Sequence, residues 1–261
     1  MQYGISTASL YPMPTEDVLK LFAQRRIPYC EIFFNTVSEL SPNYVRALRK
    51  TADRGGVRVL SAHPFTCAFE PFMLFTAYER RFRDGIEWHK RYFDAMNILG
   101  ASVFVFHGDR KQGTLPDAEY YERFAVLRDL GKRFGITVAQ ENVERCKSCS
   151  SAFLKEMIRY LDGDVSLVFD NKQARRAGVD CVSFVEQFAA HICHVHISDY
   201  TNDCDCAPVA ENSPHVTDIL RTLQKHGYSG GVVTELYRSM LQKDEDVFLS
   251  YRNLAESLCI N

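Results

Sequence analysis

The chain has 261 residues, of which 46% are hydrophobic and 25% charged, and its formal net charge is -2. This composition is typical of a globular protein with a sizeable core. The 31 basic and 33 acidic residues are nearly balanced and form no basic cluster, which argues against a nucleic-acid-binding protein. No apolar segment approaches the roughly 20 residues that a membrane-spanning helix needs. Neither nucleic acid nor a membrane is therefore expected as a partner.

The chain start and the cysteines bear on the cellular compartment. Residues 1–6 lead directly into a predicted strand, without the basic and apolar leader that directs secretion. The nine cysteines are an odd number spread over the whole chain, which indicates reduced thiols. We therefore expect a cytoplasmic protein.

Strand-like and helix-like segments alternate along the chain. Runs of β-branched and aromatic residues predict strands at 3–7, 29–34, 57–63, 101–107, 135–141, 165–170, 192–199 and 231–235. Apolar residues at helical spacing, with start and stop signals, predict helices at 15–26, 41–55, 76–99, 117–134, 150–161, 214–226 and 244–258. A Phe- and Pro-rich loop is expected at 65–75. A polar turn and a short helix ending near residue 190 should follow the sixth strand.

Eight strand–helix units without a linker predict an α/β fold of one class, the (β/α)8 TIM barrel, with a single domain over residues 1–261. In such barrels the carboxyl ends of the strands surround one cavity, where the functional site lies. Six predicted strand ends carry side chains that titrate or bind metals: His63, His107, Glu141, Asp170, His196 and Glu235.

The seventh strand combines two different faces. His194, His196 and Ser198 lie on one face, and the apolar side chains of Cys193, Val195 and Ile197 lie on the other. Histidines in a buried strand can simply satisfy each other's hydrogen bonds. The recurrence of His, Asp or Glu at so many strand ends favours a site instead.

Four of these strand-end residues suit a divalent cation. Two glutamates, one aspartate and one histidine form a mixed oxygen and nitrogen donor set for Mn²⁺, Mg²⁺, Co²⁺ or Zn²⁺, namely Glu141, Asp170, His196 and Glu235. Without a cation, three carboxylates at one barrel mouth would repel each other. The alternative is a polar rim held together by salt bridges.

Several short motifs occur in an informative order and spacing. They are AQEN at 139–142, FD at 169–170 with Gly178 downstream, HVHISD at 194–199, and GYSG at 227–230 running into TELY at 234–237. Through them nearly the whole chain resembles the xylose-isomerase-like barrels. That family includes sugar epimerases, hydroxypyruvate isomerase, inosose dehydratase and the AP endonuclease family 2 nucleases.

The resemblance implies roles for the strand-end residues. Glu141, Asp170, His196 and Glu235 would hold one divalent metal ion, the expected cofactor. Glu141 and Glu235 would move protons on opposite faces of a sugar, next to a carbonyl and through an enediolate. His63 and His107 match positions that contact substrate in the epimerases and bind additional zinc in the nucleases; buried, hydrogen-bonded histidines are the alternative.

Two departures from the family pattern concern substrate binding. The family usually has Asp-x-x-His after the sixth strand, whereas Gln173 takes the place of that histidine and is expected to bind a sugar hydroxyl. Its presence argues against the three-zinc nuclease site. The arginine that often follows His-x-x-Asp is absent from 203–208, with Lys172 or Arg145 as its candidate replacements.

Two cysteine pairs, Cys146 with Cys149 and Cys204 with Cys206, follow the fifth and seventh strands on the same face of the barrel. We expect free or partly oxidised thiols there. A structural zinc held by four thiolates is the less favoured alternative.

We therefore predict an enzyme of carbohydrate metabolism, a metal-dependent isomerase or epimerase acting on a small sugar, keto-sugar or polyol derivative. A dehydratase of the inosose type is the main alternative. An AP-endonuclease-like phosphodiesterase and a non-catalytic sugar- or metal-sensing barrel are less favoured. The sequence leaves open the substrate, its phosphorylation, the metal and the formation of a homo-oligomer.

Overall fold

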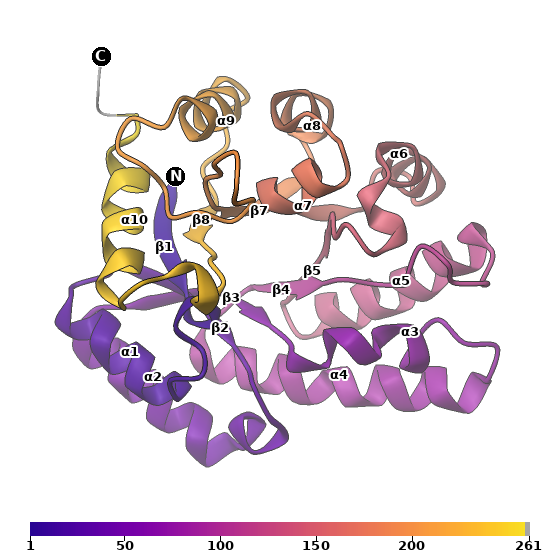
Figure 1. Ribbon diagram of the computed structural model, residues 1–261. Coiled ribbons are helices and arrows are strands. Elements are labelled where there is room, and N and C mark those ends of the chain that lie inside the picture. The colour runs from indigo at the N-terminus through magenta and orange to yellow at the C-terminus, as the bar shows by residue number, and fades with distance from the viewer. Residues whose placement is uncertain (259–261) are drawn as a thin grey trace.

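Eight parallel strands form a closed barrel in the computed structural model, which describes residues 1–258 (Figure 1). Each strand pairs with the next one in the chain, and β8 pairs with β1 to close the barrel. The strands are β1 (Gln2–Ser6), β2 (Tyr29–Phe33), β3 (Arg58–His63), β4 (Val103–Phe106), β5 (Thr137–Glu141), β6 (Ser166–Asp170), β7 (Ile192–Ile197) and β8 (Gly231–Thr234). The predicted (β/α)8 TIM barrel is confirmed.

Helices connect the strands and surround them (Figure 1). They are α1 (Thr15–Gln24), α2 (Pro42–Gly55), α3 (Glu70–Met73), α4 (Glu79–Leu99), α5 (Asp117–Arg133), α6 (Ser151–Tyr160), α7 (Asn171–Arg176), α8 (Cys181–Phe188), α9 (Pro214–Lys225) and α10 (Glu245–Glu256). Within residues 1–258, none of the helices has the length and apolar character required to cross a lipid bilayer.

Helix α2 shows how local sequence sets the element boundaries. Pro42 occupies its first turn, where the missing N–H group costs nothing. Gly56 ends the helix with φ at 68°, a left-handed conformation that glycine adopts without strain. Val45, Leu48 and Ala52 form its buried stripe. These signals explain why the predicted bounds of this helix hold to within one residue.

Two segments differ from the expectation. The predicted loop at 65–75 contains a 3-10 helix, η3 (Phe65–Phe69), and the four-residue helix α3. The predicted polar turn after β6 is helix α7, because the Asp170 carboxylate accepts a hydrogen bond from the backbone N–H of Gln173 and caps the helix. All three helices are too short for apolar periodicity to reveal them.

The hydrophobic core has two parts. The larger part packs the outer faces of the strands against the helices, with fully buried aromatic rings such as Phe104 and Phe106. The smaller part lies among Val105, Ala139 and Val168 of successive strands. Cys193 packs against this small cluster, whereas Val195 and Ile197 belong to the larger one, so the expectation that all three share one face is wrong for Cys193.

Two register shifts in the barrel redirect side chains. The one between β6 and β7 accounts for the position of Cys193, and both help to arrange the site. Between β6 and β7 the pairing shifts after Leu167, so that Cys193 is passed over and Asp170 lies opposite His196. Between β2 and β3 a shift places Glu31 opposite Ser61. A bulge of this kind redirects side chains that regular pairing would place elsewhere.

Candidate metal and substrate site

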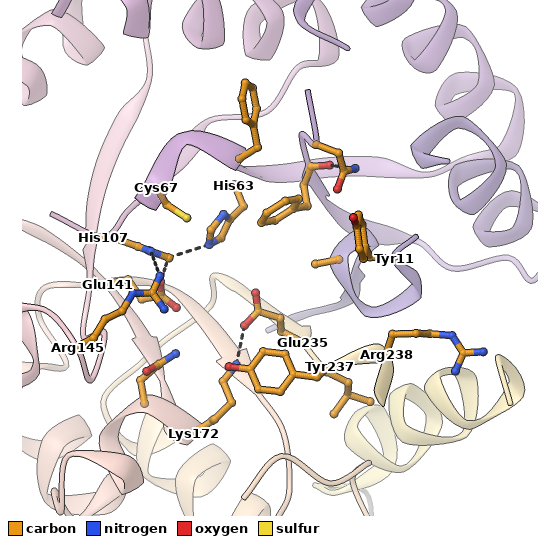
Figure 2. A pocket seen from close by; sticks show the side chains of 16 residues that line it. Tyr11, His63, Cys67, His107, Glu141, Arg145, Lys172, Glu235, Tyr237 and Arg238 are labelled. Carbon is orange, nitrogen blue, oxygen red and sulfur yellow. Dashed lines mark hydrogen bonds and ion pairs between the residues drawn. The ribbon is translucent and has the colours of Figure 1, made fainter. Parts of the chain in front are cut away.

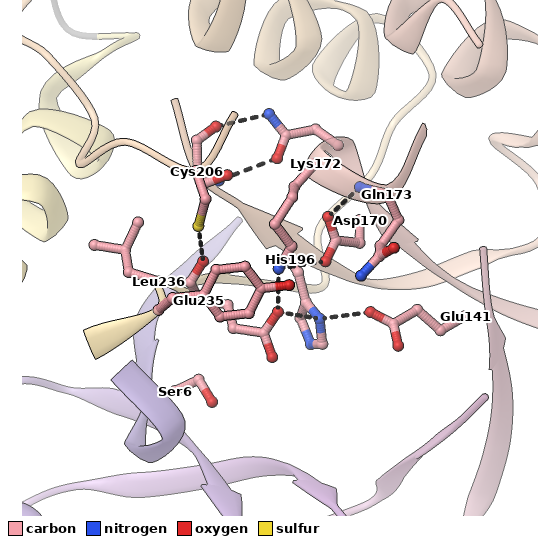
Figure 3. Close-up of polar contacts among 12 residues, drawn as sticks. Ser6, Glu141, Asp170, Lys172, Gln173, His196, Cys206, Glu235 and Leu236 are labelled. Atoms are coloured by element: carbon pink, nitrogen blue, oxygen red, sulfur yellow. Dashed lines mark hydrogen bonds and ion pairs between the residues drawn. The ribbon is translucent and has the colours of Figure 1, made fainter. Parts of the chain in front are cut away.

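The four residues of the predicted donor set lie together at the carboxyl ends of the strands (Figure 3). Glu141 and Asp170 are the last residues of β5 and β6, His196 lies near the end of β7, and Glu235 directly follows β8. One side-chain ligand atom from each residue lies within 4.8 Å of the others. The barrel therefore brings this set together as the strand-end pattern predicts.

Side-chain amides hold the strand ends in place. Asn142 donates from Nδ2 to the carbonyl of Asp170, 3.0 Å away, and accepts the Asp170 N–H at 2.7 Å. Asn171 makes the same pair of contacts with the backbone of Ser198, at 2.7 and 3.0 Å. These amides continue the ladder hydrogen bonding beyond the strands, so the ligand-bearing ends have little freedom to move.

His196 lies between carboxylates on both of its nitrogens. Nδ1 lies 3.2 Å from Glu141 Oε1 and 3.5 Å from Glu235 Oε2, so the two glutamates flank the ring (Figure 3). Nε2 lies 3.1 Å from Glu31 Oε2, on the side facing the barrel interior. The ring therefore presents Nδ1 to the candidate metal site, and Glu31 fixes its orientation from behind.

Glu31 is fully buried and has a complete set of partners. Its carboxylate accepts hydrogen bonds from Ser6 Oγ at 2.9 Å and Ser61 Oγ at 2.8 Å, and His194 Nε2 lies 3.3 Å away. Burial alone would raise the pKa of Glu31, but the His196 and His194 rings outweigh burial and hold it well below its usual value. Burial alone would lower the pKa of His196, but the carboxylates of Glu31 and Glu235 outweigh burial and raise it.

A second contact chain leads from Glu141 through His107 to His63, two residues that line the cavity. His107 Nε2 lies 2.7 Å from Glu141 Oε2 and 3.0 Å from His63 Nε2. Burial opposes the charge on both Glu141 and His107, yet their attraction lowers the pKa of the carboxyl and raises that of the imidazole. Burial and the neighbouring His107 lower the pKa of His63 to about 4, so this ring is neutral. His63 and His107, with Cys67, form a further group that could hold a metal ion.

Lys172 brings a positive charge into the carboxylate cluster. Its side chain is 3% exposed, and Nζ lies 3.1 Å from Asp170 Oδ2 and 3.0 Å from Glu235 Oε2. Burial disfavours the charge, but the two carboxylates keep the pKa of Lys172 well above its usual value. Burial raises the pKa of Asp170 to about 6, although Lys172 acts in the opposite direction.

Two carboxylate oxygens in the cluster fit a cation. Asp170 Oδ1 accepts the cap hydrogen bond from Gln173, while its buried Oδ2 accepts no hydrogen bond of normal geometry. The buried Glu141 Oε2 also accepts none, despite its close ion-pair contact with His107. Unsatisfied buried carboxylate oxygens beside an imidazole nitrogen are a suitable donor set for a divalent metal. The residues present therefore fit the metal that the fold family implies.

A cavity of about 480 Å³ opens above this cluster (Figure 2). Six of the eight predicted site residues line it: His63, His107, Glu141, Lys172, Gln173 and Glu235. The other two, Asp170 and His196, are each 1% exposed and touch the lining residues from below. Apolar and aromatic side chains such as Phe33, Phe65 and Leu236 form other parts of the wall.

The structure adds residues that the strand-end pattern did not select. Glu31 stands in the middle of β2, and its only sequence signal is a carboxylate among apolar neighbours. Cys67 lies in the 3-10 helix η3 and carries no sequence signal. The predicted alternative of a zinc held by Cys146, Cys149, Cys204 and Cys206 has no support among residues 1–258, where these cysteines are free and form no potential metal-binding group.

The fold and the site together define the class of the protein, a (β/α)8 barrel with a candidate metal centre at the carboxyl ends of its strands. Residues 25–252 match the model of the family described as xylose isomerase-like TIM barrel, and the chain belongs to that family. No curated protein matches the chain.

Several solved structures share this barrel. A D-tagatose 3-epimerase-like protein is 20% identical, with a TM-score of 0.79 over 100% of this chain and 98% of that one. The IOLI protein, solved with a zinc atom, is 18% identical, with a TM-score of 0.74 over 98% and 96% of the two chains. The probable 3-DHS dehydratase AsbF from Bacillus anthracis is 13% identical, with a TM-score of 0.77 over the full length of both. At these identities the likeness shows the common fold.

Proposed function

We propose that the protein is a divalent-metal-dependent isomerase or epimerase of a sugar or sugar derivative. The observation that carries the proposal is the placement of Glu141 and Glu235 on either side of His196, at the floor of one cavity (Figure 3). Two carboxylates that reach a substrate from different directions can remove a proton and return one at another face or carbon.

The electrostatics support proton transfer by this pair. Burial opposes ionisation of both glutamates, but His107 and His196 lower the pKa of Glu141, and Lys172 and His196 lower the pKa of Glu235. Both side chains are therefore carboxylates at neutral pH, the form that a general base needs. The contact of His107 with Glu141 at 2.7 Å favours the ionised carboxylate, so a proton that Glu141 takes from carbon is readily given back to the substrate.

Metal and substrate would occupy adjacent parts of the site. Glu141, Asp170, His196 and Glu235 would hold the ion, which supplies positive charge to polarise a substrate carbonyl. Lys172 and Gln173 line the cavity next to these ligands and would donate hydrogen bonds to substrate oxygens. His63 and His107 line the adjoining wall and would position the substrate there.

Deuterium uptake at the substrate α-carbon tests the proposal. Glu141→Gln and Glu235→Gln should each reduce uptake from D₂O by at least about a hundredfold, because general acid–base catalysis contributes about that much or more. Glu144→Gln is the matched control, since Glu144 pairs with Lys111 at the surface and does not line the cavity. Undiminished uptake in both site variants would refute the assigned roles. Release of a dehydrated product would instead assign the alternative lyase reaction.

A further inference from the structure

We propose that the substrate carries an anionic group, a carboxylate or a phosphate, and that Arg145 binds it. The inference rests on the proposed function of the same site and narrows its substrate class. Arg145 is exposed, follows β5 and lines the cavity beside His107 and Glu141 (Figure 2). Its guanidinium contacts His107 Nδ1 at 3.3 Å, and within residues 1–258 it forms no ion pair with a carboxylate.

Arg145 is the cation at this cavity whose charge is left unbalanced. Arg238 also lines the cavity but lies 2.9 Å from Asp244. The carboxylates in the cavity floor already face positive or protonatable groups, Glu141 with His107 and Glu235 with Lys172. The acids in the floor are therefore not available to Arg145, and a bound metal ion would add further positive charge beneath the substrate.

The main chain around Arg145 is held firmly. Its carbonyl accepts the N–H of Lys111 at 3.1 Å, and the next residue, Cys146, forms an antiparallel bridge with Arg110. On the other side, the N–H of Glu144 donates to Gln173 Oε1 at 2.9 Å. A guanidinium carried by an anchored segment loses less conformational freedom on binding a ligand than one on a free loop.

Gln173 adds a hydrogen-bond donor to the part of the cavity wall that carries Arg145. Because its Oε1 accepts the N–H of Glu144, its Nε2 amide group is a donor, and no residue within 1–258 accepts a hydrogen bond from it. Gln173 and Arg145 line the same cavity, with Lys172 next to Gln173 in the chain. Three donors on one wall suit a group with several acceptor oxygens, and the planar guanidinium matches a carboxylate or phosphate in particular.

The position of Arg145 limits the size of the substrate. One imidazole ring, that of His107, separates the guanidinium from Glu141 Oε2. An anion bound by Arg145 would therefore lie only a few carbon atoms from the carbon that Glu141 deprotonates. This geometry favours a short keto acid or a short ketose phosphate over a neutral hexose.

Binding of small probes tests the inference independently of turnover. The protein as purified is titrated with glycerol, D-glycerate and glycerol 3-phosphate, a neutral compound and its carboxylate and phosphate counterparts. We expect one of the anions to bind at least about tenfold more tightly than glycerol, as a charged hydrogen bond provides. Arg145→Gln should remove that preference, and Arg145→Lys should retain part of it. Arg110→Gln is the matched control, because Arg110 is exposed on the neighbouring loop and does not line the cavity.

The outcomes separate this inference from the proposed function. Equal binding of all three probes, or an anion preference that survives in Arg145→Gln, would overturn the anionic substrate. Deuterium uptake by neutral ketoses that is equally fast in Arg145→Gln would also overturn it, while leaving the isomerase intact. Anion binding that depends on Arg145, without uptake by any keto acid, ketose phosphate or neutral ketose, would support the anion site and reject the isomerase.

Discussion

Lys172 and Glu235 form a partly buried ion pair in which Nζ lies 3.0 Å from Oε2, beside the group of residues that would hold a metal ion (Figure 2). The same ammonium lies 3.1 Å from Asp170 Oδ2. A metal bound by these oxygens would have to share them with Lys172 or displace it. The lysine would therefore compete with a metal ion, and after displacement its ammonium would be free to contact a substrate oxygen in the cavity.

Replacing Lys172 by methionine should strengthen metal binding. Removal of a charge that repels the metal and occupies two of its ligand oxygens should raise the affinity for Mn²⁺ or Zn²⁺ by about tenfold or more. Calorimetric titration of metal-free protein measures this affinity. The variant should also gain more thermal stability from added metal than the wild type does, because two buried carboxylates lack their cation. Unchanged or weaker affinity would show that Lys172 does not compete.

Replacing Glu31 by glutamine should weaken metal binding, because Glu31 contacts the nitrogen of His196 that points away from the candidate metal site. Glu31 holds His196 through a contact of 3.1 Å to Nε2, and carboxylates of this kind orient metal-binding histidines and increase their basicity. Loss of such a carboxylate typically reduces metal affinity by about 10- to 100-fold. Glu39→Gln is the control, because Glu39 lies in the short 3-10 helix Val37–Leu40 that follows β2 and belongs to none of the potential metal-binding groups. Equal affinities in the two variants would argue against an orienting role for Glu31.

The fold and much of the site could be predicted because both depend on local patterns. Alternating strands and helices predict a barrel, and the chemistry of a barrel lies at the strand ends, where Glu141 and Asp170 stand as the last residues of their strands. The pairing of Asn142 with the backbone of Asp170 has no such local signal, because it joins strand ends 28 positions apart.

The parts that could not be predicted depend on contacts between distant residues. Glu31 meets His196 across 165 positions of sequence, after a register shift that the sequence of β2 does not reveal. The sequence could assign Lys172 to the cavity but not its contacts with Asp170 and Glu235. These contacts depend on helix α7, which is too short to be predicted from the sequence. Short helices and bulges are decided by tertiary contacts rather than by periodicity.

Glu70 should make stability depend on pH. The residue is 2% exposed and its carboxyl group accepts hydrogen bonds from the N–H groups of His107 and Gly108, yet burial raises its pKa to about 8. The unfolded chain releases this proton near the usual pKa of 4.5, so between about pH 4.5 and 8 the folded state binds the proton more tightly. The contribution of Glu70 to the free energy of unfolding should therefore fall as pH rises through this window and level off above it.

The comparison of wild type with Glu70→Gln isolates that contribution. Glutamine keeps the acceptor oxygen but cannot ionise, so the wild type should lose up to about 4 kcal/mol relative to the variant between pH 5 and 8. Urea unfolding at several pH values measures both proteins. A difference that stays constant across the range would show that Glu70 ionises normally in the folded protein.

Gly108, directly after His107, should tolerate no side chain. Its φ is 83°, and a Cβ atom there would lie 2.0 Å from the hydroxyl oxygen of Tyr120. That hydroxyl donates to Gln140 Oε1, and Gln140 Nε2 in turn donates to the carbonyl of His107. A displaced Tyr120 would therefore disturb His107, which contacts Glu141.

Gly108→Ala and Gly56→Ala separate this steric effect from backbone strain. Gly56 also has positive φ, at 68°, but nothing lies within 4 Å of a Cβ atom added there. We expect Gly56→Ala to cost about 1–2 kcal/mol of unfolding free energy, the usual penalty of a left-handed alanine, and to preserve deuterium uptake. Gly108→Ala should cost at least about 1 kcal/mol more, because the Tyr120 hydrogen bond is lost as well, and it should also reduce uptake. Equal losses of stability in the two variants, with uptake preserved in both, would show that the segment carrying His107 adapts without consequence for the site.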